Sequence, residues 1–125
     1  MSSEKFSIKK RFKSFTHAFA GLSYLIKNEH NAWIHCGATA LVVILGILLH
    51  ISAAEWIAVV VAIGIVFAAE TFNSAIERVA DMVQPERDER VRVIKDLCAG
   101  AVLVCAISAA IVGCIIFIPR LIALF

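Results

Sequence analysis

The sequence predicts an all-α integral membrane protein, in which an N-terminal amphipathic surface helix precedes three transmembrane helices. Hydrophobic residues make up 61% of its 125 residues and the mean hydropathy is +0.88, whereas soluble domains are closer to half apolar. The apolar residues are concentrated in three long runs, as in membrane spans. The basic residues lie almost entirely beside these runs, not within them. At this length we expect one domain, residues 1–125.

The N-terminal segment, residues 1–29, has the pattern of a helix with one apolar face. Large apolar residues recur at three- and four-residue steps: Ile8, Phe12, Phe15, Phe19, Leu22 and Ile26. Five basic residues cluster between Lys5 and Lys13. Such a helix lies in the membrane surface, with its rings toward lipid and its lysines toward anionic headgroups. A soluble amphipathic helix is the alternative, which the adjoining apolar runs disfavour.

Three segments are expected to cross the membrane: residues 31–54, 56–82 and 97–119. The first contains 24 residues and the third 23 without Asp, Glu, Lys or Arg, enough to cross a hydrocarbon core of about 30 Å at about 1.5 Å per residue. Pro85 is expected to end the second helix, because proline lacks the N–H that a helix interior needs. The four cysteines all fall in apolar segments without metal-ligand or disulfide spacing, so we interpret them as apolar fillers.

The basic residues also predict the orientation in the membrane. Of the twelve Lys and Arg residues, eleven precede the first span or lie between Arg78 and Lys95, and only Arg120 follows the third span. By the positive-inside rule, the N-terminus and the link between the second and third spans are cytoplasmic, and the C-terminus is outside. The charged N-terminus shows no pattern of a cleavable signal, so we expect none.

The second span ends in a polar stretch, AETFNSAIERVADM at residues 69–82. On a helix, Glu70, Asn73, Glu77 and Asp81 fall at about 0°, 300°, 340° and 20°, so they share one narrow face. Glu70 lies about 10 Å deeper than Glu77, where a charged group costs roughly 2.5 kcal/mol or more. A functional role is therefore the first hypothesis. The alternative is a polar contact between helices, with Glu70 protonated or paired.

Two further clusters belong at the same cytoplasmic level: Glu29 just before the first span, and Lys95 and Asp96 just before the third. Glu29 and Glu77 are suitable ligands for magnesium, which prefers carboxylates, waters and phosphate oxygens, and Lys95 offers a positive charge to phosphate. Glu70 lies deeper, where a lipid headgroup arrives and a general base is needed. This set suits phosphoryl transfer from a cytosolic nucleotide to a membrane alcohol. Ordinary solvated interface charge is the alternative for each cluster taken singly.

The chain has neither a Walker-type phosphate loop nor a protein-kinase glycine loop, so a nucleotide site must be built differently. The stretch ETFNSAIERVAD at 70–81 resembles the signature E-x-x-N-[ST]-A-[IL]-E-x-x-x-D of the bacterial diacylglycerol kinase and undecaprenol kinase family. KDLCAGAVL at 95–103 resembles that family's second block, K-D-x-x-A-G-A-V-L. Gly-Leu at 21–22 and Asn-Glu at 28–29 also match in order and spacing, so the resemblance covers essentially the whole chain.

The resemblance implies ATP-dependent, magnesium-dependent phosphorylation of a lipid hydroxyl by a homotrimer of the bacterial inner membrane, with active sites shared between subunits. It implies that Glu70 is the catalytic base and meets the lipid, and that Glu29 and Glu77 hold the metal. The positions implied for ATP binding are Lys10, His17, Glu29, Asn73, Glu77, Glu86, Asp88, Lys95 and Asp96. Two of them depart from the family pattern: Lys10 stands where arginine is common, and His17 where an aromatic residue is common.

The identity of the lipid rests on a short stretch, NEHNAWIH at residues 28–35. It resembles the undecaprenol kinase branch, which carries E-x-N-x-x-I-H here, and favours undecaprenol; diacylglycerol is the alternative acceptor. Both are alcohols with a hydroxyl near the interface, so the residues themselves do not decide. We expect no nucleic-acid partner.

A different class of protein, a small proton- or cation-coupled transporter, also carries intramembrane carboxylates. It predicts polar residues in more than one span, whereas 31–54 and 97–119 contain no charged residue. A non-enzymatic membrane scaffold is a third option, and it leaves Glu70 unexplained.

Overall fold

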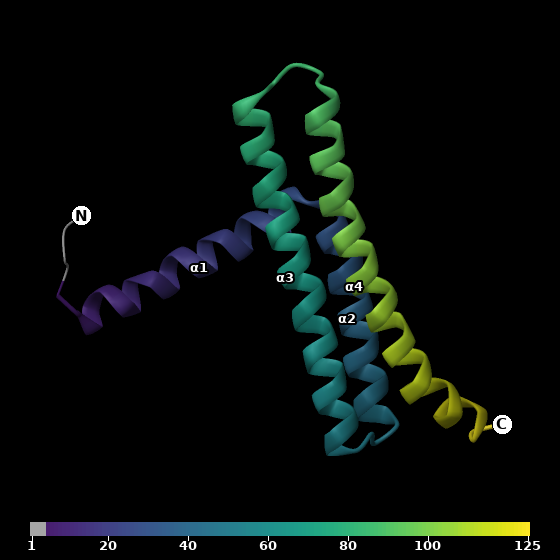
Figure 1. Cartoon of the computed structure of the whole chain (residues 1–125). Coiled ribbons are helices and arrows are strands. Elements are labelled where there is room, and N and C mark those ends of the chain that lie inside the picture. Colours follow the sequence, from purple (N-terminus) through teal and green to yellow (C-terminus); the bar gives the residue numbers. More distant parts are fainter. Residues whose placement is uncertain (1–4) are drawn as a thin grey trace.

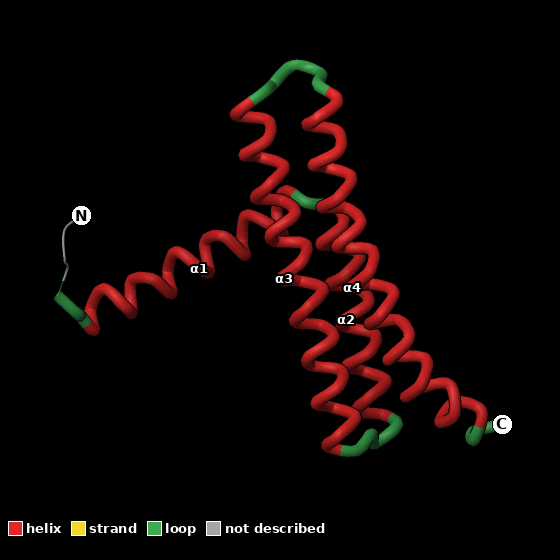
Figure 2. Tube along the Cα trace, viewed as in Figure 1, coloured by secondary structure: helices red, strands yellow, loops and turns green. Residues whose placement is uncertain are grey.

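The computed structural model describes residues 5–125, and they fold into four helices: α1 (Ile8–Asn28), α2 (His30–Leu48), α3 (Ala53–Val83) and α4 (Glu89–Ile122). Figure 1 shows α3 lying along α2 and α4, while α1 extends away at a steep angle. The described chain is helical throughout apart from short connections, as Figure 2 shows. Three of the helices, α2, α3 and α4, are long and apolar enough to cross a membrane. The prediction of an all-α protein with three long apolar helices is confirmed.

Local sequence signals set where these helices begin and end. Ser52 caps α3 in a capping box with Glu55, in which each residue bonds the other's backbone N–H. Gln84 ends α3 just before Pro85, as the missing proline N–H requires. Glu29 is the single residue between α1 and α2, and its extended backbone (φ −110°, ψ 114°) lets the chain change direction there. The polar end of α3 is thereby placed beside this junction.

The helices differ in length, and the difference exposes one end of the bundle. α2 has 19 residues, α3 has 31 and α4 has 34, which at about 1.5 Å per residue gives about 28, 46 and 51 Å. Figure 1 shows the α3–α4 link well beyond the α1–α2 junction. The charged turns of α3 and α4 therefore continue past the end of α2, outside the length needed to cross a bilayer.

The apolar core lies toward the opposite end, near the α2–α3 turn. Ile51, Val59, Ile116 and Phe117 are each less than 9% exposed and form one cluster. At the same end, Arg120 of α4 donates hydrogen bonds to the Glu55 carboxylate of α3. One end of the bundle is thus closed by apolar packing and an ion pair, whereas the other carries the polar face of α3.

Candidate active site at the α1–α2 junction

Glu70 is the most deeply buried charged side chain of the described residues. It is 1% exposed, on the side of α3 that faces α2. Its Oε2 is buried and has no hydrogen-bond partner within residues 5–125. The Nε2 atom of His35, on α2, lies 3.7 Å from this oxygen. A buried polar atom without a partner costs about 1–3 kcal/mol and requires an explanation.

Asn73 repeats this feature one turn further along α3. Its Oδ1 atom is also buried and lacks a hydrogen-bond partner among the described residues. Glu77 follows on the same helix and is half-buried. Two unpartnered oxygens and a carboxylate therefore lie along one face of α3, and such oxygens are suited to a ligand that supplies hydrogen-bond donors or a cation.

Glu29 fastens the α1–α2 junction to this face. Its Oε1 accepts a hydrogen bond from Ser74 Oγ at 2.9 Å and another from Arg78 Nη2 at 3.0 Å. The Arg78 guanidinium also lies over the ring of Tyr24 in α1, 4.4 Å from its centroid. The side chains of the ion pair are 44% and 26% exposed, so we expect it to position the junction more than to stabilise the fold.

Lys95 connects α4 to the same end of α3. Its ammonium Nζ donates to Asp81 Oδ1 at 2.7 Å, and Glu77 is close enough to interact with it electrostatically. The structure therefore brings Glu29, Glu77 and Lys95 to one end of the bundle, from the α1–α2 junction, α3 and α4. This is the level at which the sequence predicted a rim for metal and phosphate.

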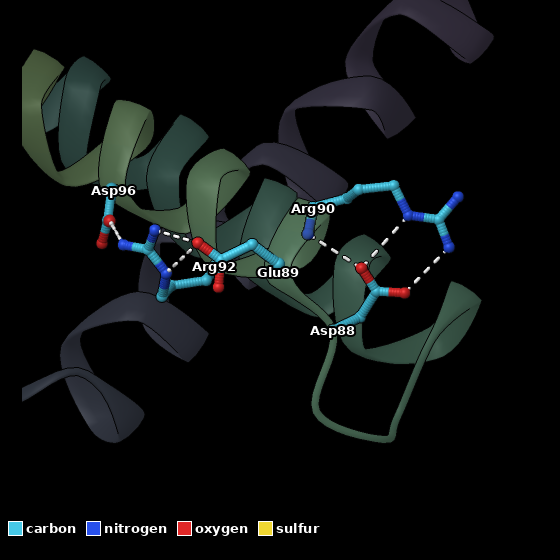
Figure 3. A network of polar contacts seen from close by, with 5 residues as sticks. All are labelled: Asp88, Glu89, Arg90, Arg92 and Asp96. Atoms are coloured by element: carbon cyan, nitrogen blue, oxygen red, sulfur yellow. Dashed lines mark hydrogen bonds and ion pairs between the residues drawn. The ribbon is translucent and has the colours of Figure 1, made fainter.

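Two further predicted ATP contacts, Asp88 in the link and Asp96 in α4, are paired with arginines, as Figure 3 shows. Asp88 caps α4 and accepts hydrogen bonds from the guanidinium and backbone N–H of Arg90, and this guanidinium holds the pKa of the Asp88 carboxyl well below its usual range. Arg92 donates to both Glu89 and Asp96. These carboxylates are thus paired with cations; Glu86, in the same link, is exposed.

Lys10 and His17 lie apart from the other predicted site residues of the chain. Both belong to the first half of α1, which extends away from the other helices (Figure 1). α1 is buried only at Leu25, and along the helix Lys10 and His17 lie about 22 Å and about 12 Å from it at about 1.5 Å per residue. A single chain does not bring these two residues to Glu70.

Within residues 5–125, no three His, Cys, Asp or Glu side chains are grouped closely enough to form a metal site by themselves. Both contacts of Glu29 are made by Oε1. Magnesium commonly binds proteins through only one or two carboxylates, with waters and substrate phosphates completing the shell. The donor set at this end of the bundle fits such a site.

The sequence did not identify three side chains that the structure places here: His35, Ser74 and Arg78. Ser74 and Arg78 follow Glu70 by four and eight residues, so they lie about 40° and 80° around the helix from it. Their helical spacing from Glu70 could have predicted that they lie near the polar face of α3, but only acidic and amide residues were assigned to that face from the sequence. His35 was used there only as part of the stretch that resembles the undecaprenol kinase branch.

An apolar cavity of about 390 Å³ lies between α2, α3 and α4, next to this polar face. Its walls include Val66 and Phe67 of α3 and Ala106 and Ala110 of α4, and His35 is one of its few polar lining residues. His35 therefore lines this apolar cavity and also lies 3.7 Å from the buried Glu70 carboxylate.

Comparison with known proteins gives the class of reaction. Residues 16–117 match the family model described as prokaryotic diacylglycerol kinase. The chain belongs to this family. This kinase is 37% identical over 110 residues to an undecaprenol kinase of Bacillus subtilis, covering 88% of this chain and 89% of that protein.

It is also 36% identical over 112 residues to a diacylglycerol kinase of Synechocystis, covering 89% of this chain and 64% of that longer protein. The prediction of a membrane lipid kinase that uses ATP as phosphoryl donor is thereby confirmed over that of a transporter.

Proposed function

We propose that this kinase transfers the γ-phosphoryl group of ATP to the hydroxyl of undecaprenol, giving undecaprenyl phosphate. The observation that carries the proposal is the buried Glu70 carboxylate, with an unpartnered Oε2, placed deeper than a rim of carboxylates and a lysine. This arrangement offers a base to a membrane alcohol and charged groups to a nucleotide. The similarity to a protein named undecaprenol kinase supports this choice of lipid.

The proposed reaction is an in-line displacement at the γ-phosphorus. Glu70 takes the proton of the lipid hydroxyl, and the alcohol oxygen forms a bond to the γ-phosphorus. The bond between that phosphorus and the β,γ-bridging oxygen breaks, and ADP leaves with the electron pair. Asn73 and Lys95 are placed to orient the nucleotide, Asn73 through its unpartnered Oδ1 or its amide N–H groups and Lys95 through its charge.

Magnesium, when bound, neutralises phosphate charge in reactions of this type. We assign its protein ligands to Glu29 and Glu77, which lie at the same end of the bundle. Glu29 is already directed onto α3 by Ser74 and Arg78. Two carboxylates and the phosphates of ATP would complete the shell that magnesium prefers.

The position of α1 supports a shared active site. We assign Lys10 and His17 to the ATP site of a neighbouring subunit in a homotrimer, because the first half of α1 extends away from its own chain's polar face. Glu86, Asp88 and Asp96 would cover the nucleotide from the link and the start of α4.

We place α1 in the membrane surface, the N-terminus and link in the cytoplasm of a bacterial inner membrane, and the C-terminus outside, with residues 1–125 as one domain.

Diacylglycerol is the second candidate acceptor, favoured by the similarity to a protein named diacylglycerol kinase. Purified protein in lipid nanodiscs is given γ-labelled ATP and either undecaprenol or diacylglycerol, with phosphatidylcholine, which has no free hydroxyl, as control. We expect label in undecaprenyl phosphate, with kcat/KM at least about tenfold above that for diacylglycerol, a difference of about 1.4 kcal/mol. A preference for diacylglycerol would overturn the choice of lipid, and absence of label in both alcohols would overturn the function.

A further inference from the structure

We propose that His35 is a positioning residue for Glu70, and that its imidazole directs the carboxylate toward the acceptor hydroxyl. The proposal rests on the assignment of Glu70 as the base. The two side chains come from different helices, α2 and α3, so the contact between them depends on the fold and not on neighbouring sequence.

The contact itself is the first argument. His35 Nε2 lies 3.7 Å from Glu70 Oε2, and the two side chains are 18% and 2% exposed. Oε2 has no hydrogen-bond partner within the described residues, so Nε2 is the polar group placed to meet it. The separation exceeds the usual limit of about 3.2 Å for a hydrogen bond, but catalytic contacts are often long before substrate binds and then shorten.

The surroundings of the imidazole are the second argument. Its ring meets that of Phe67 edge-on, with centroids 6.2 Å apart and an interplanar angle of 70°. Phe67 precedes Glu70 by three residues on α3, so the ring and the carboxylate touch His35 from one side of the same helix. His35 also lines the apolar cavity, where few other groups satisfy an N–H.

These contacts give the two oxygens of the Glu70 carboxylate different roles. A donor fixed on Oε2 leaves Oε1 to accept the proton of the alcohol. Orientation of a base by a third group recurs in enzymes that activate a hydroxyl. A displacement of about 1 Å at a reacting group costs on the order of 10²-fold in rate, so an unanchored Glu70 should act more slowly without changing how ATP binds.

The test uses three substitutions that differ in how far a hydrogen-bond donor at position 35 extends toward Glu70. His35→Leu removes the N–H, His35→Asn keeps an amide one methylene short, and His35→Gln extends an amide N–H toward the carboxylate. His50→Asn is the matched control: it removes an exposed histidine in the turn between α2 and α3, where φ of 51° suits asparagine. Each full-length protein is reconstituted in nanodiscs and checked for assembly, and kcat and both KM values are measured with undecaprenol and ATP.

We expect His35→Leu and His35→Asn to lower kcat by about 10²-fold, with the KM for ATP within about twofold of the parent. His35→Gln should recover at least about tenfold of that loss, and His50→Asn should match the parent. If His35→Leu fails to assemble, comparing the kcat of His35→Asn with that of His35→Gln tests the proposal. Equal kcat in those two variants, or parent-like kcat in His35→Leu, would overturn the proposal.

Glu70→Gln in the same assay separates this outcome from failure of the proposed function. If Glu70→Gln is inactive while His35→Leu turns over like the parent, Glu70 remains the base and only the role of His35 is wrong. If Glu70→Gln stays active, the assignment of the base is wrong, and the role of His35 as its positioning residue is overturned with it.

Discussion

Replacing Glu70 by glutamine should abolish phosphoryl transfer without destabilising the protein. The substitution keeps the shape of the side chain and removes its charge and its capacity to take a proton. Most substitutions of buried polar residues cost stability because they break a hydrogen bond. Oε2 of Glu70 has no such bond in the described residues, so the usual loss is absent here.

The two effects have different sizes. A general base contributes about 10²–10⁴-fold to rate, which at about 1.36 kcal/mol per tenfold is about 2.7–5.5 kcal/mol of transition-state free energy. A buried charge in a membrane span costs roughly 2.5 kcal/mol or more, and glutamine removes that cost. We therefore expect turnover to fall at least about 10²-fold while the thermal midpoint stays or rises. The KM for ATP should not change, because Glu70 lies about 10 Å deeper than Glu77.

Glu55→Gln is the matched control, since it makes the same chemical change at the other end of α3. Glu55 pairs with Arg120 and closes the capping box with Ser52. Glutamine also serves in a capping box, so only the ion pair with Arg120 is weakened. We expect a small fall in the thermal midpoint and parent-like turnover, the reverse of the pattern for Glu70→Gln.

The assay measures turnover with labelled ATP, ATP affinity and thermal unfolding in one detergent, after size-exclusion chromatography shows equal assembly. Turnover of Glu70→Gln within about threefold of the parent, far short of the range for a lost base, would refute the role of Glu70. A thermal midpoint that falls further than that of Glu55→Gln would instead refute the inference that the carboxylate lacks a stabilising partner.

Three further predictions follow from the structure and the charge pattern. A reporter active only in the cytoplasm should be silent when fused after Phe125, and strong activity there would overturn the proposed orientation. Glu29→Gln and Glu77→Gln should each raise the magnesium concentration for half-maximal turnover at saturating ATP; unchanged midpoints in both would exclude them as ligands. Gly46→Ala should destabilise the bundle by about 1–3 kcal/mol, because the added Cβ would lie 2.7 Å from a ring carbon of Trp56. Gly37→Ala is the control and should be neutral, because a Cβ there meets nothing within 4 Å. Equal thermal midpoints for the two variants would refute this packing.

The four helices were predictable from sequence because their signals are local. Apolar runs, the capping residues before α3 and Pro85 after it each act within a few residues. The same periodicity predicted that Glu70 and Glu77 share one face of α3 at different depths, and in the structure Glu70 is buried while Glu77 is half-buried.

Contacts between helices were not predictable in the same way. Arg78 meets Glu29 across 49 residues, and His35 meets Glu70 across two helices. The 3.6-residue periodicity of one helix shows which of its faces is apolar, but not which other helix packs against that face. The sequence predicted a boundary between residues 29 and 31, and the structure adds that the break between α1 and α2 is the single extended residue Glu29.

The two ends of the bundle treat their polar groups differently, and this difference argues that the polar face of α3 serves function. Near the α2–α3 turn, Glu55 is satisfied twice, by Ser52 and by Arg120. On the polar face, buried oxygens of Glu70 and Asn73 have no hydrogen-bond partner among the described residues, although the same helix carries both regions. Sequences that specify a fold satisfy buried polar groups, and the exceptions concentrate where a protein acts on a ligand. These oxygens lie where the lipid hydroxyl and the nucleotide are proposed to meet. A bound nucleotide would supply the partner that Asn73 lacks, and the His35 contact with Glu70 Oε2, now 3.7 Å long, would shorten once substrate binds.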